Sequence, residues 1–347
     1  MLTQRANADV LAPDGDPFHV FELRNEQGMR VQITDWGATW LSCQVPVNHQ
    51  LREVLLGCQL QDYPRQSAYL GASIGRYANR IAHSRFQLGD KLIKLQANQG
   101  LHQLHGGAGG FHQRRWQLDN CCSIAQNRGQ KSLRFLLFSE NGDQGFNGNA
   151  QISVTYHLHN DNCLEIIYQG QLDQTGALNL TNHAYFNLDE QHNDVRQHWL
   201  QIYSDYYLPV DSEGIPNAPL TSVTNTSFDF RQMKQIGRDF LQGDQCVTKG
   251  YDHSFLLNNA QSAVKLYSEK QDLCLTISTS QPAIQIYTGN YLQGIPTRNG
   301  SCYQDYNGIA LETQCLPDSP NHPEWQKYGG IIKANTDYTQ WTKFCFS

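Results

Sequence analysis

Gln151-Ile152-Ser153-Val154-Thr155-Tyr156-His157-Leu158 is the stretch that decides the fold. Apolar side chains alternate in it with polar ones, and a period of two is that of a β-strand with two different faces. Similar alternation recurs at 31–33 and 273–278, and turn-forming clusters occur at 141–143, 147–149, 160–162 and 298–300. The pattern predicts short strands joined by tight turns.

Stretches with apolar residues at helical spacing are scarce, and 28 Gly and 12 Pro leave room mainly for short strands. No internal repeat, low-complexity linker or shift of composition divides the chain. We therefore predict an all-β protein, a large antiparallel β-sandwich with few short helices, that forms a single domain over residues 1–347. Its 17 Tyr, 14 Phe and 6 Trp can fill a substantial core.

The formal net charge is −6 and the basic residues are scattered, which disfavours nucleic acid or an anionic membrane as the partner. A neutral or polar small molecule fits better, and no obligate protein partner is implied. Met1 to Asp16 lacks the apolar core of a signal peptide, and no stretch approaches the roughly 20 apolar residues of a membrane helix. We expect a cytoplasmic protein whose ten cysteines are all reduced thiols.

Two glycine-flanked segments carry polar groups suited to binding. Gly75-Arg76-Tyr77-Ala78-Asn79-Arg80-Ile81 holds two arginines, which either orient a ligand or pair with acids, with even weight for each reading. Leu104-His105-Gly106-Gly107 lets the backbone approach a ligand closely beside an imidazole. A phosphate cradle is the weaker alternative, because the segment lacks the spacing of a phosphate-binding loop.

Four further segments read as strands that carry polar groups. In Thr181 to Leu188, His183, Tyr185 and Asn187 share a face, although a lone histidine is more often a core residue than a catalyst. The sequence also places Asp252 opposite His253, Gln285 beside Tyr287, and Glu312 opposite Ile309 and Leu311. Asp252 either binds hydroxyl groups or caps a turn. Glu312 most needs an explanation, because a carboxylate in an uncharged strand is costly to bury without a partner.

Taken in order, these motifs resemble those of the galactose mutarotase (aldose 1-epimerase) family. The resemblance runs from about Phe21 to the C-terminus and rests on six motifs in the same order, the last being Leu311-Glu312-Thr313-Gln314 with Pro317-Asp318-Ser319-Pro320-Asn321. It implies a mutarotase-like supersandwich and an isomerase of galactose and carbohydrate metabolism that interconverts the α and β anomers of galactose- or glucose-type free aldoses. It implies neither a cofactor nor a metal.

The resemblance also implies roles for particular residues. His183 would be the general acid and Glu312 the general base of ring opening and reclosure. The remaining matched positions would bind the sugar: Asn79, Arg80, His105, Tyr185, Asp252 and Gln285. At their ordinary pKa values Glu312 is ionised and His183 charged only near or below neutrality, and we expect the facing opposite charges to widen that window and give a bell-shaped pH dependence.

Two alternatives stay open. One is a non-catalytic sugar-binding or sensing protein on the same fold, since fold does not fix function. The other is a hexose-6-phosphate 1-epimerase, which would require additional Arg or Lys at the cleft. A metal-dependent hydrolase, suggested by the 13 histidines, is disfavoured because their spacing matches no recurrent ligand pattern.

Overall fold

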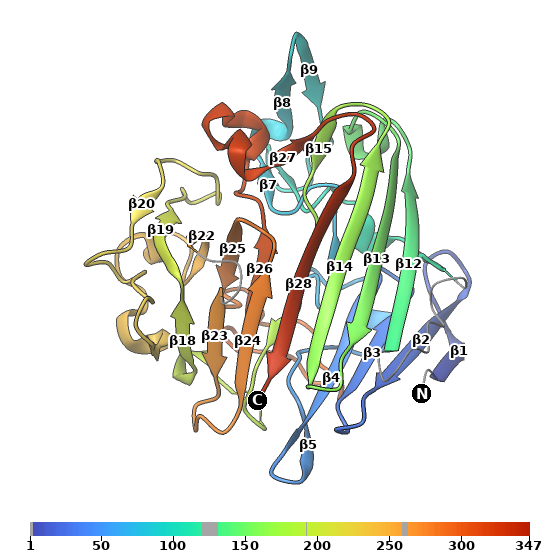
Figure 1. Cartoon of the computed structure of the whole chain (residues 1–347), viewed down its shortest axis with the longest axis vertical. Coiled ribbons are helices and arrows are strands. Elements are labelled where there is room, and N and C mark those ends of the chain that lie inside the picture. Colours follow the sequence, from blue (N-terminus) through green and yellow to red (C-terminus); the bar gives the residue numbers. More distant parts are fainter. Residues whose placement is uncertain (1–2, 120–130, 192, 259–262) are drawn as a thin grey trace.

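A computed structural model describes residues 3–119, 131–191, 193–258 and 263–347, and its largest unit is a nine-stranded antiparallel sheet (Figure 1). In spatial order the strands are β11 (Gln117–Leu118), β12 (Lys131–Ser139), β13 (Ala150–Leu158), β14 (Cys163–Leu172), β28 (Tyr338–Phe346), β24 (Cys274–Thr279), β23 (Val264–Tyr267), β18 (Trp199–Ile202) and β21 (Lys234–Gln235). The last strand of the chain thus lies in the middle of this sheet.

Two further antiparallel sheets complete the framework. A six-stranded sheet has the order β17 (Tyr185–Phe186), β26 (Ile309–Gln314), β25 (Ala283–Tyr287), β22 (Asp252–Leu257), β19 (Ser204–Leu208) and β20 (Thr221–Ser222). A five-stranded sheet consists of β1 (Thr3–Leu11), β2 (Pro17–Arg24), β3 (Arg30–Thr34), β4 (Thr39–Val47) and β5 (Gln50–Glu53). Four two-stranded ladders accompany the large sheets: β7 (Arg80–Ile81) with β10 (Gln103–Leu104), β6 (Ser73–Ile74) with β16 (Thr181–Asn182), β15 (Gly176–Leu178) with β27 (Gly330–Ile332), and β8 (Arg85–Leu88) with β9 (Lys91–Lys94).

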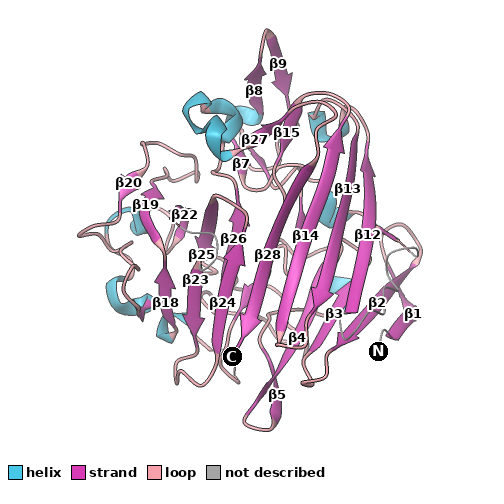
Figure 2. Cartoon of the chain, viewed as in Figure 1, coloured by secondary structure: helices cyan, strands magenta, loops and turns pink. Residues whose placement is uncertain are grey.

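The helices of the described residues are all short 3₁₀ turns at the periphery (Figure 2). They are η1 (Leu60–Asp62), η2 (Ala82–Ser84), η3 (Phe111–Gln113), η4 (Asp143–Gly145), η5 (Val195–Gln197), η6 (Ile236–Asp239), η7 (Gly243–Cys246), η9 (Ser319–Asn321) and η10 (Pro323–Tyr328). None of them, over the part of the chain that the structure describes, is long and apolar enough to cross a membrane.

The three large sheets pack on one another as a sandwich with a shared core. One cluster of buried hydrophobic side chains includes members from all three sheets. Phe21 of β2 meets Phe135 of β12 edge to face at a centroid distance of 5.5 Å, and Trp40 of β4 meets Phe344 of β28 at 5.4 Å. The predicted all-β sandwich is therefore confirmed, and the 151–158 alternation coincides with β13, whose residues at 152, 154, 156 and 158 are buried.

Two predictions about local structure are wrong. Thr181 to Leu188 is not one strand: β16 pairs with β6 and β17 pairs with β26, with a break between them. Asn187 consequently does not share a surface with His183. Its Nδ2 donates to the carbonyl oxygens of Asn193 (2.7 Å) and Asn307 (2.8 Å), so it has a structural role.

The cysteines also depart from the prediction that all ten are reduced. Cys163 of β14 and Cys345 of β28 are register partners, and their Cα atoms, 4.1 Å apart, are joined through a disulfide. Adjacent antiparallel strands place the two side chains on the same face of the sheet, which brings the thiols together. Six cysteines are free thiols, namely Cys43, Cys58, Cys246, Cys274, Cys302 and Cys315, while Cys121 and Cys122 lie outside the described residues.

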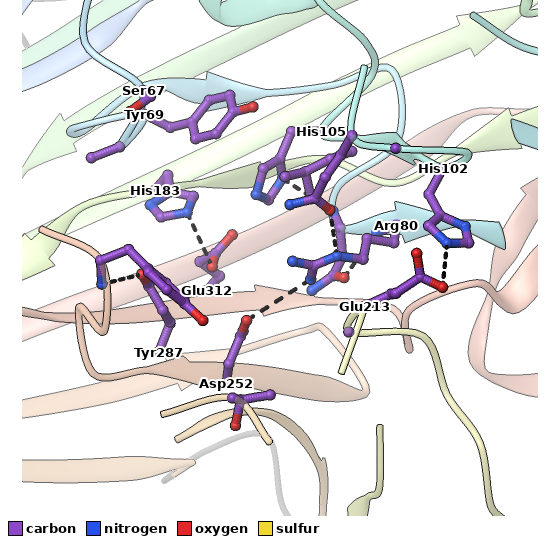
Figure 3. A pocket seen from close by; sticks show the side chains of 18 of the residues that line it. Ser67, Tyr69, Arg80, His102, His105, His183, Glu213, Asp252, Tyr287 and Glu312 are labelled. Carbon is purple, nitrogen blue, oxygen red and sulfur yellow. Dashed lines mark hydrogen bonds and ion pairs between the residues drawn. The ribbon is translucent and has the colours of Figure 1, made fainter. Parts of the chain in front are cut away.

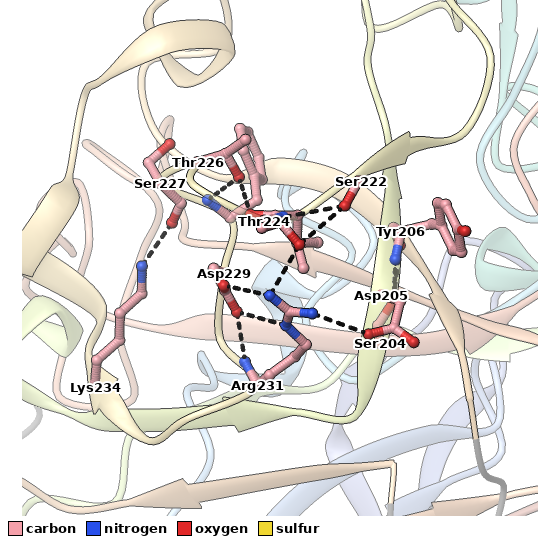
Figure 4. Close-up of polar contacts among 12 residues, drawn as sticks. Ser204, Asp205, Tyr206, Ser222, Thr224, Thr226, Ser227, Asp229, Arg231 and Lys234 are labelled. Carbon is pink, nitrogen blue, oxygen red and sulfur yellow. Dashed lines mark hydrogen bonds and ion pairs between the residues drawn. The ribbon is translucent and has the colours of Figure 1, made fainter.

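A polar network fixes the edge of the six-stranded sheet at β19 and β20 (Figure 4). The Arg231 guanidinium donates to Asp229 (2.7 Å), to Asp205 at the start of β19 (3.3 Å) and to Thr224 Oγ1 (3.0 Å). Thr224 Oγ1 in turn accepts a hydrogen bond from Ser222 Oγ of β20 (3.1 Å). These contacts hold β19 and β20 in place, and the loop that connects the two strands lines a cleft.

Candidate active site

A cleft of about 490 Å³ lies on the face of the six-stranded sheet that is turned away from the shared core (Figure 3). Strand alternation produces this arrangement: Ile286 and Leu311 enter the core, while the residues that follow them, Tyr287 and Glu312, line the cleft. The lining residues are Ser67, Ala68, Tyr69, Asn79, Arg80, Gln99, Gly100, His102, Leu104, His105, His183, Tyr185, Ser212, Glu213, Gly214, Val247, Thr248, Asp252, Tyr287, Tyr291 and Glu312.

His183 and Glu312 face each other at the floor of this cleft. His183 lies between β16 and β17, and Glu312 is in β26, so residues 129 positions apart in sequence meet with Nε2 3.5 Å from Oε1. Both side chains are at least 95% buried. Glu312 Oε2 has no hydrogen-bond partner among the described residues, which leaves one acceptor aimed at whatever fills the cleft.

Burial dominates the protonation states of this pair. It lowers the pKa of His183 to about 3 and raises the pKa of Glu312 well above its ordinary value, with the nearby Asp252 carboxylate raising it further. The expectation that facing opposite charges favour both charged forms is therefore not met, because burial shifts both pKa values toward the neutral forms. Removing the two groups from water outweighs their mutual attraction, so burial favours the neutral form of each.

Asn79, Arg80 and His105 are brought together by the short β7–β10 ladder. The backbone N–H of Asn79 donates to His105 Nδ1 (3.1 Å), so the other ring nitrogen, Nε2, carries the proton of the neutral imidazole. Burial, with the neighbouring His183, holds the pKa of His105 well below its ordinary value. His105 is thus a fixed neutral donor, and Asp318, from the last quoted motif, supports Arg80 by donating its N–H to the Arg80 carbonyl (2.9 Å).

Sequence alone did not separate the two arginines of the 75–81 segment, but the structure does. Arg76 is 2% exposed and donates to four backbone carbonyls, including those of Gly148 (2.8 Å) and Asn147 (3.0 Å). Arg80 instead lines the cleft, with its Nε donating to Gln99 Oε1 (2.7 Å) and its Nη1 3.9 Å from Asp252. Arg76 therefore holds loops together, and Arg80 is the arginine available to a ligand.

Seven of the eight predicted site residues line the cleft: Asn79, Arg80, His105, His183, Tyr185, Asp252 and Glu312. The eighth, Gln285, is absent from the lining and donates its Nε2 to Asp252 Oδ1 (2.7 Å), which orients that carboxylate. His253 points the other way and packs against Phe228 in the core, at a centroid distance of 4.6 Å.

Other residues that line the cleft were not predicted from the sequence. The Tyr69 ring stacks on His183 at 5.7 Å and meets His105 edge to face at 4.7 Å, so it encloses both imidazoles. Glu213 lies 3.5 Å from His102 at the rim. Tyr287 follows from the alternation that placed it beside Gln285, whereas no local pattern indicates Tyr69 or Glu213.

Three residues of the cleft, His105, His183 and Glu312, could in principle hold a metal ion. Ligand atoms of His105, His183 and Glu312 lie within 4.8 Å of one another, close enough for a cation. However, Asn79 donates to His105 Nδ1, which places the ring proton on Nε2 and removes the lone pair that a metal at the cleft would require. The donor set fits a polar organic ligand better than a metal.

The large antiparallel β-sandwich with a polar cleft on one of its sheets defines a protein of the mutarotase-like fold. The aldose 1-epimerase family model matches residues 19–345, and the chain belongs to the aldose 1-epimerase family. It is accordingly an isomerase, an aldose 1-epimerase.

Known proteins of this family match along nearly the whole chain. The aldose 1-epimerase of Haemophilus influenzae is 60% identical over 339 residues, covering 96% of this chain and 97% of its own. The galactose mutarotase of Homo sapiens is 32% identical over 347 residues, covering 98% of each. A galactose 1-epimerase structure from Lactobacillus acidophilus superposes with a TM-score of 0.86 at 27% identity, covering 100% of this chain and 98% of its own.

Proposed function

We propose that the cleft binds one galactose- or glucose-type free aldose, with His183 as general acid and Glu312 as general base of anomer interconversion. The observation that carries the proposal is the buried His183–Glu312 pair, 3.5 Å apart, at the floor of a cleft lined by hydroxyl, amide and carboxylate groups. A free sugar offers hydroxyls that both donate and accept, which suits such a lining.

Ring opening needs a proton removed from the anomeric hydroxyl and a proton given to the ring oxygen. Glu312 takes the first and His183 supplies the second, and the two groups exchange roles when the ring closes on the other face. Burial favours the neutral pair, with a proton on Glu312, and moving that proton to His183 produces the carboxylate and imidazolium without uptake from water. Positioned acid and base groups typically contribute about 10² to 10⁴ each.

The remaining residues orient the sugar. Arg80 and the protonated Nε2 of His105 are donors for the ring oxygen, where they favour the negative charge that develops as the ring opens. Asp252, held by Gln285 (2.7 Å), is the acceptor for sugar hydroxyls. Asn79 presents its amide beside them, and its Oδ1 also accepts the Arg80 backbone N–H (2.8 Å).

Three properties complete the proposal. The protein acts as a single domain over residues 1–347, works in the cytoplasm, and takes a neutral sugar in preference to a phosphorylated one. Arg80 is the one Lys or Arg among the described lining residues, against the carboxyl groups of Glu213, Asp252 and Glu312. That balance disfavours a phosphate, which requires paired cations.

Polarimetric decay of freshly dissolved α-galactose and α-glucose tests the proposal. We expect Glu312→Gln and His183→Asn each to lower kcat by about 10² to 10⁴ while the protein stays folded. His159 and Glu165 form a contact outside the cleft, with Nε2 3.2 Å from Oε2, so His159→Asn and Glu165→Gln are matched controls that should keep full activity. A folded Glu312→Gln protein with undiminished mutarotation removes Glu312 from the mechanism, and retained sugar binding without any turnover in the unmodified protein favours the sensing alternative.

A further inference from the structure

The loop between β19 and β20 forms the wall of the cleft beside Arg80. Ser212, Glu213 and Gly214 line the cleft there. The loop is a closed turn, because the Asp211 carboxylate accepts the backbone N–H groups of Glu213 (2.9 Å) and Ile215 (3.0 Å). A turn held by its own side chain has a defined shape and can fix whatever it contacts.

Gly214 lies directly against the guanidinium of Arg80. A Cβ at this position would stand 2.6 Å from Arg80 Cζ, 2.7 Å from Nη1 and 2.8 Å from Nε, so a backbone without a side chain covers the flat face of the group. Gly214 also has φ +76°, a conformation that other residues adopt at a cost. The positive φ disfavours other residues at this position, and the contact with Arg80 leaves no space for a side chain. The two features together require glycine here.

The other contacts of Arg80 fix its edge. Nε donates to Gln99 Oε1 (2.7 Å), while the terminal nitrogens remain directed into the cleft (Figure 3). Glu213 of the same loop lies 3.5 Å from Nε2 of the buried His102, whose Nδ1 accepts the His83 N–H (3.0 Å). Arg80 is thus confined on one face by Gly214 and on one edge by Gln99.

We propose that Gly214 is a positioning residue, and that the 211–215 loop sets sugar affinity by holding the Arg80 guanidinium in one orientation toward the aldose. The inference rests on the proposal that Arg80 binds the sugar. Arginine carries its donors in a rigid fork, so a rotation of the group misdirects all of them together.

The test is Gly214→Ala, compared with Gly142→Ala. Gly142 has a similar φ of +88°, but no atom lies within 4 Å of its added Cβ, so it reports backbone strain alone. The atoms that Gly214→Ala would displace are those at the far end of the Arg80 side chain, which can shift without disturbing the backbone. We therefore expect the melting temperature of the Gly214→Ala protein to match that of the Gly142→Ala protein. We expect kcat/KM for galactose to fall about 10- to 100-fold through KM, the range for loss of a charged hydrogen bond, while kcat changes less than about threefold.

The double variant Arg80→Ala/Gly214→Ala separates positioning from general damage. If Gly214 acts through Arg80, adding Gly214→Ala to Arg80→Ala lowers kcat/KM no further. Additive losses, or a Gly214→Ala protein as active as Gly142→Ala, overturn the inference while leaving the role of Arg80 intact. An Arg80→Ala protein with unchanged kcat/KM instead overturns the sugar-binding role of Arg80, and the inference fails with it.

Discussion

The proton held by the His183–Glu312 pair leads to a prediction about pH. Turnover requires one proton on the pair, whichever partner carries it, because transfer from Glu312 to His183 leaves the count unchanged. A second proton binds only near the lowered pKa of His183, about 3, and the single proton leaves only above the raised pKa of Glu312. We therefore expect kcat/KM to decline less between pH 5 and 7 than the ordinary pKa values would give, with losses at more extreme pH giving a broad bell.

If both residues kept their ordinary pKa values, the pH dependence of kcat/KM would be different. With ordinary pKa values of 4.5 and 6.5, the fraction of pairs with one proton would fall from about 0.7 at pH 5 to about 0.2 at pH 7, a loss of roughly threefold. Polarimetry at half-unit pH steps, with the spontaneous rate subtracted and folding checked by circular dichroism, distinguishes the two. A threefold decline over this interval would refute the reasoning that burial sets the protonation states.

Three other outcomes follow from the structure. Cys163→Ser should lower the free energy of unfolding by up to about 5 kcal/mol, because the Cys163–Cys345 disulfide joins residues 182 positions apart in the chain. Cys246→Ser, at an exposed free thiol, is the control and should leave the chemical denaturation curve unchanged. Burial lowers the pKa of His253 to about 3, below its unfolded value of 6.5. The contribution of His253 to stability is therefore present above pH 6.5 and is lost as the pH falls. His253→Gln should recover about 2 kcal/mol of the free energy of unfolding that is lost at pH 5, measured by urea titration at pH 5 and 7.5. A hexose 6-phosphate should react at least about tenfold more slowly than the free hexose in the same polarimetric assay, because Arg80 is the one Lys or Arg among the described lining residues and the lining also holds Glu213 and Asp252; equal rates would contradict this.

The framework was predictable because its determinants are local. Alternation at 151–158 fixes which side of β13 is buried, and the same rule correctly set Asp252 opposite His253. Thr181 to Leu188 was not predictable in this way. A strand pattern does not reveal that its two halves pair with different partners, β6 and β26, and the disulfide of Cys163 likewise depends on the register of strands distant in the chain.

The candidate site was predictable only where a motif marked it. Of two arginines four residues apart, one is enclosed by carbonyl groups and the other faces the cleft, and this distinction arises from loops far away in sequence. The protonation of Glu312 was misjudged for a related reason. A sequence shows the ordinary pKa of a carboxyl group, whereas the shift depends on how much water the surrounding strands exclude.

Backbone conformation shows most directly what the sandwich contributes to the cleft. Tyr69, Asn79 and His105 line it with φ of +57°, +66° and +52°, in the left-handed region that residues other than glycine adopt at a cost of about 1 kcal/mol or more each. Such conformations persist only where surrounding contacts determine them, as when Asn79 N–H donates to His105 Nδ1. The large buried core offsets that cost, and the strained backbone in turn aims the imidazole and amide groups at the space that His183 and Glu312 share. A replacement that relaxed this backbone without altering any side-chain chemistry should therefore weaken catalysis, for the same reason that Gly214 matters to Arg80.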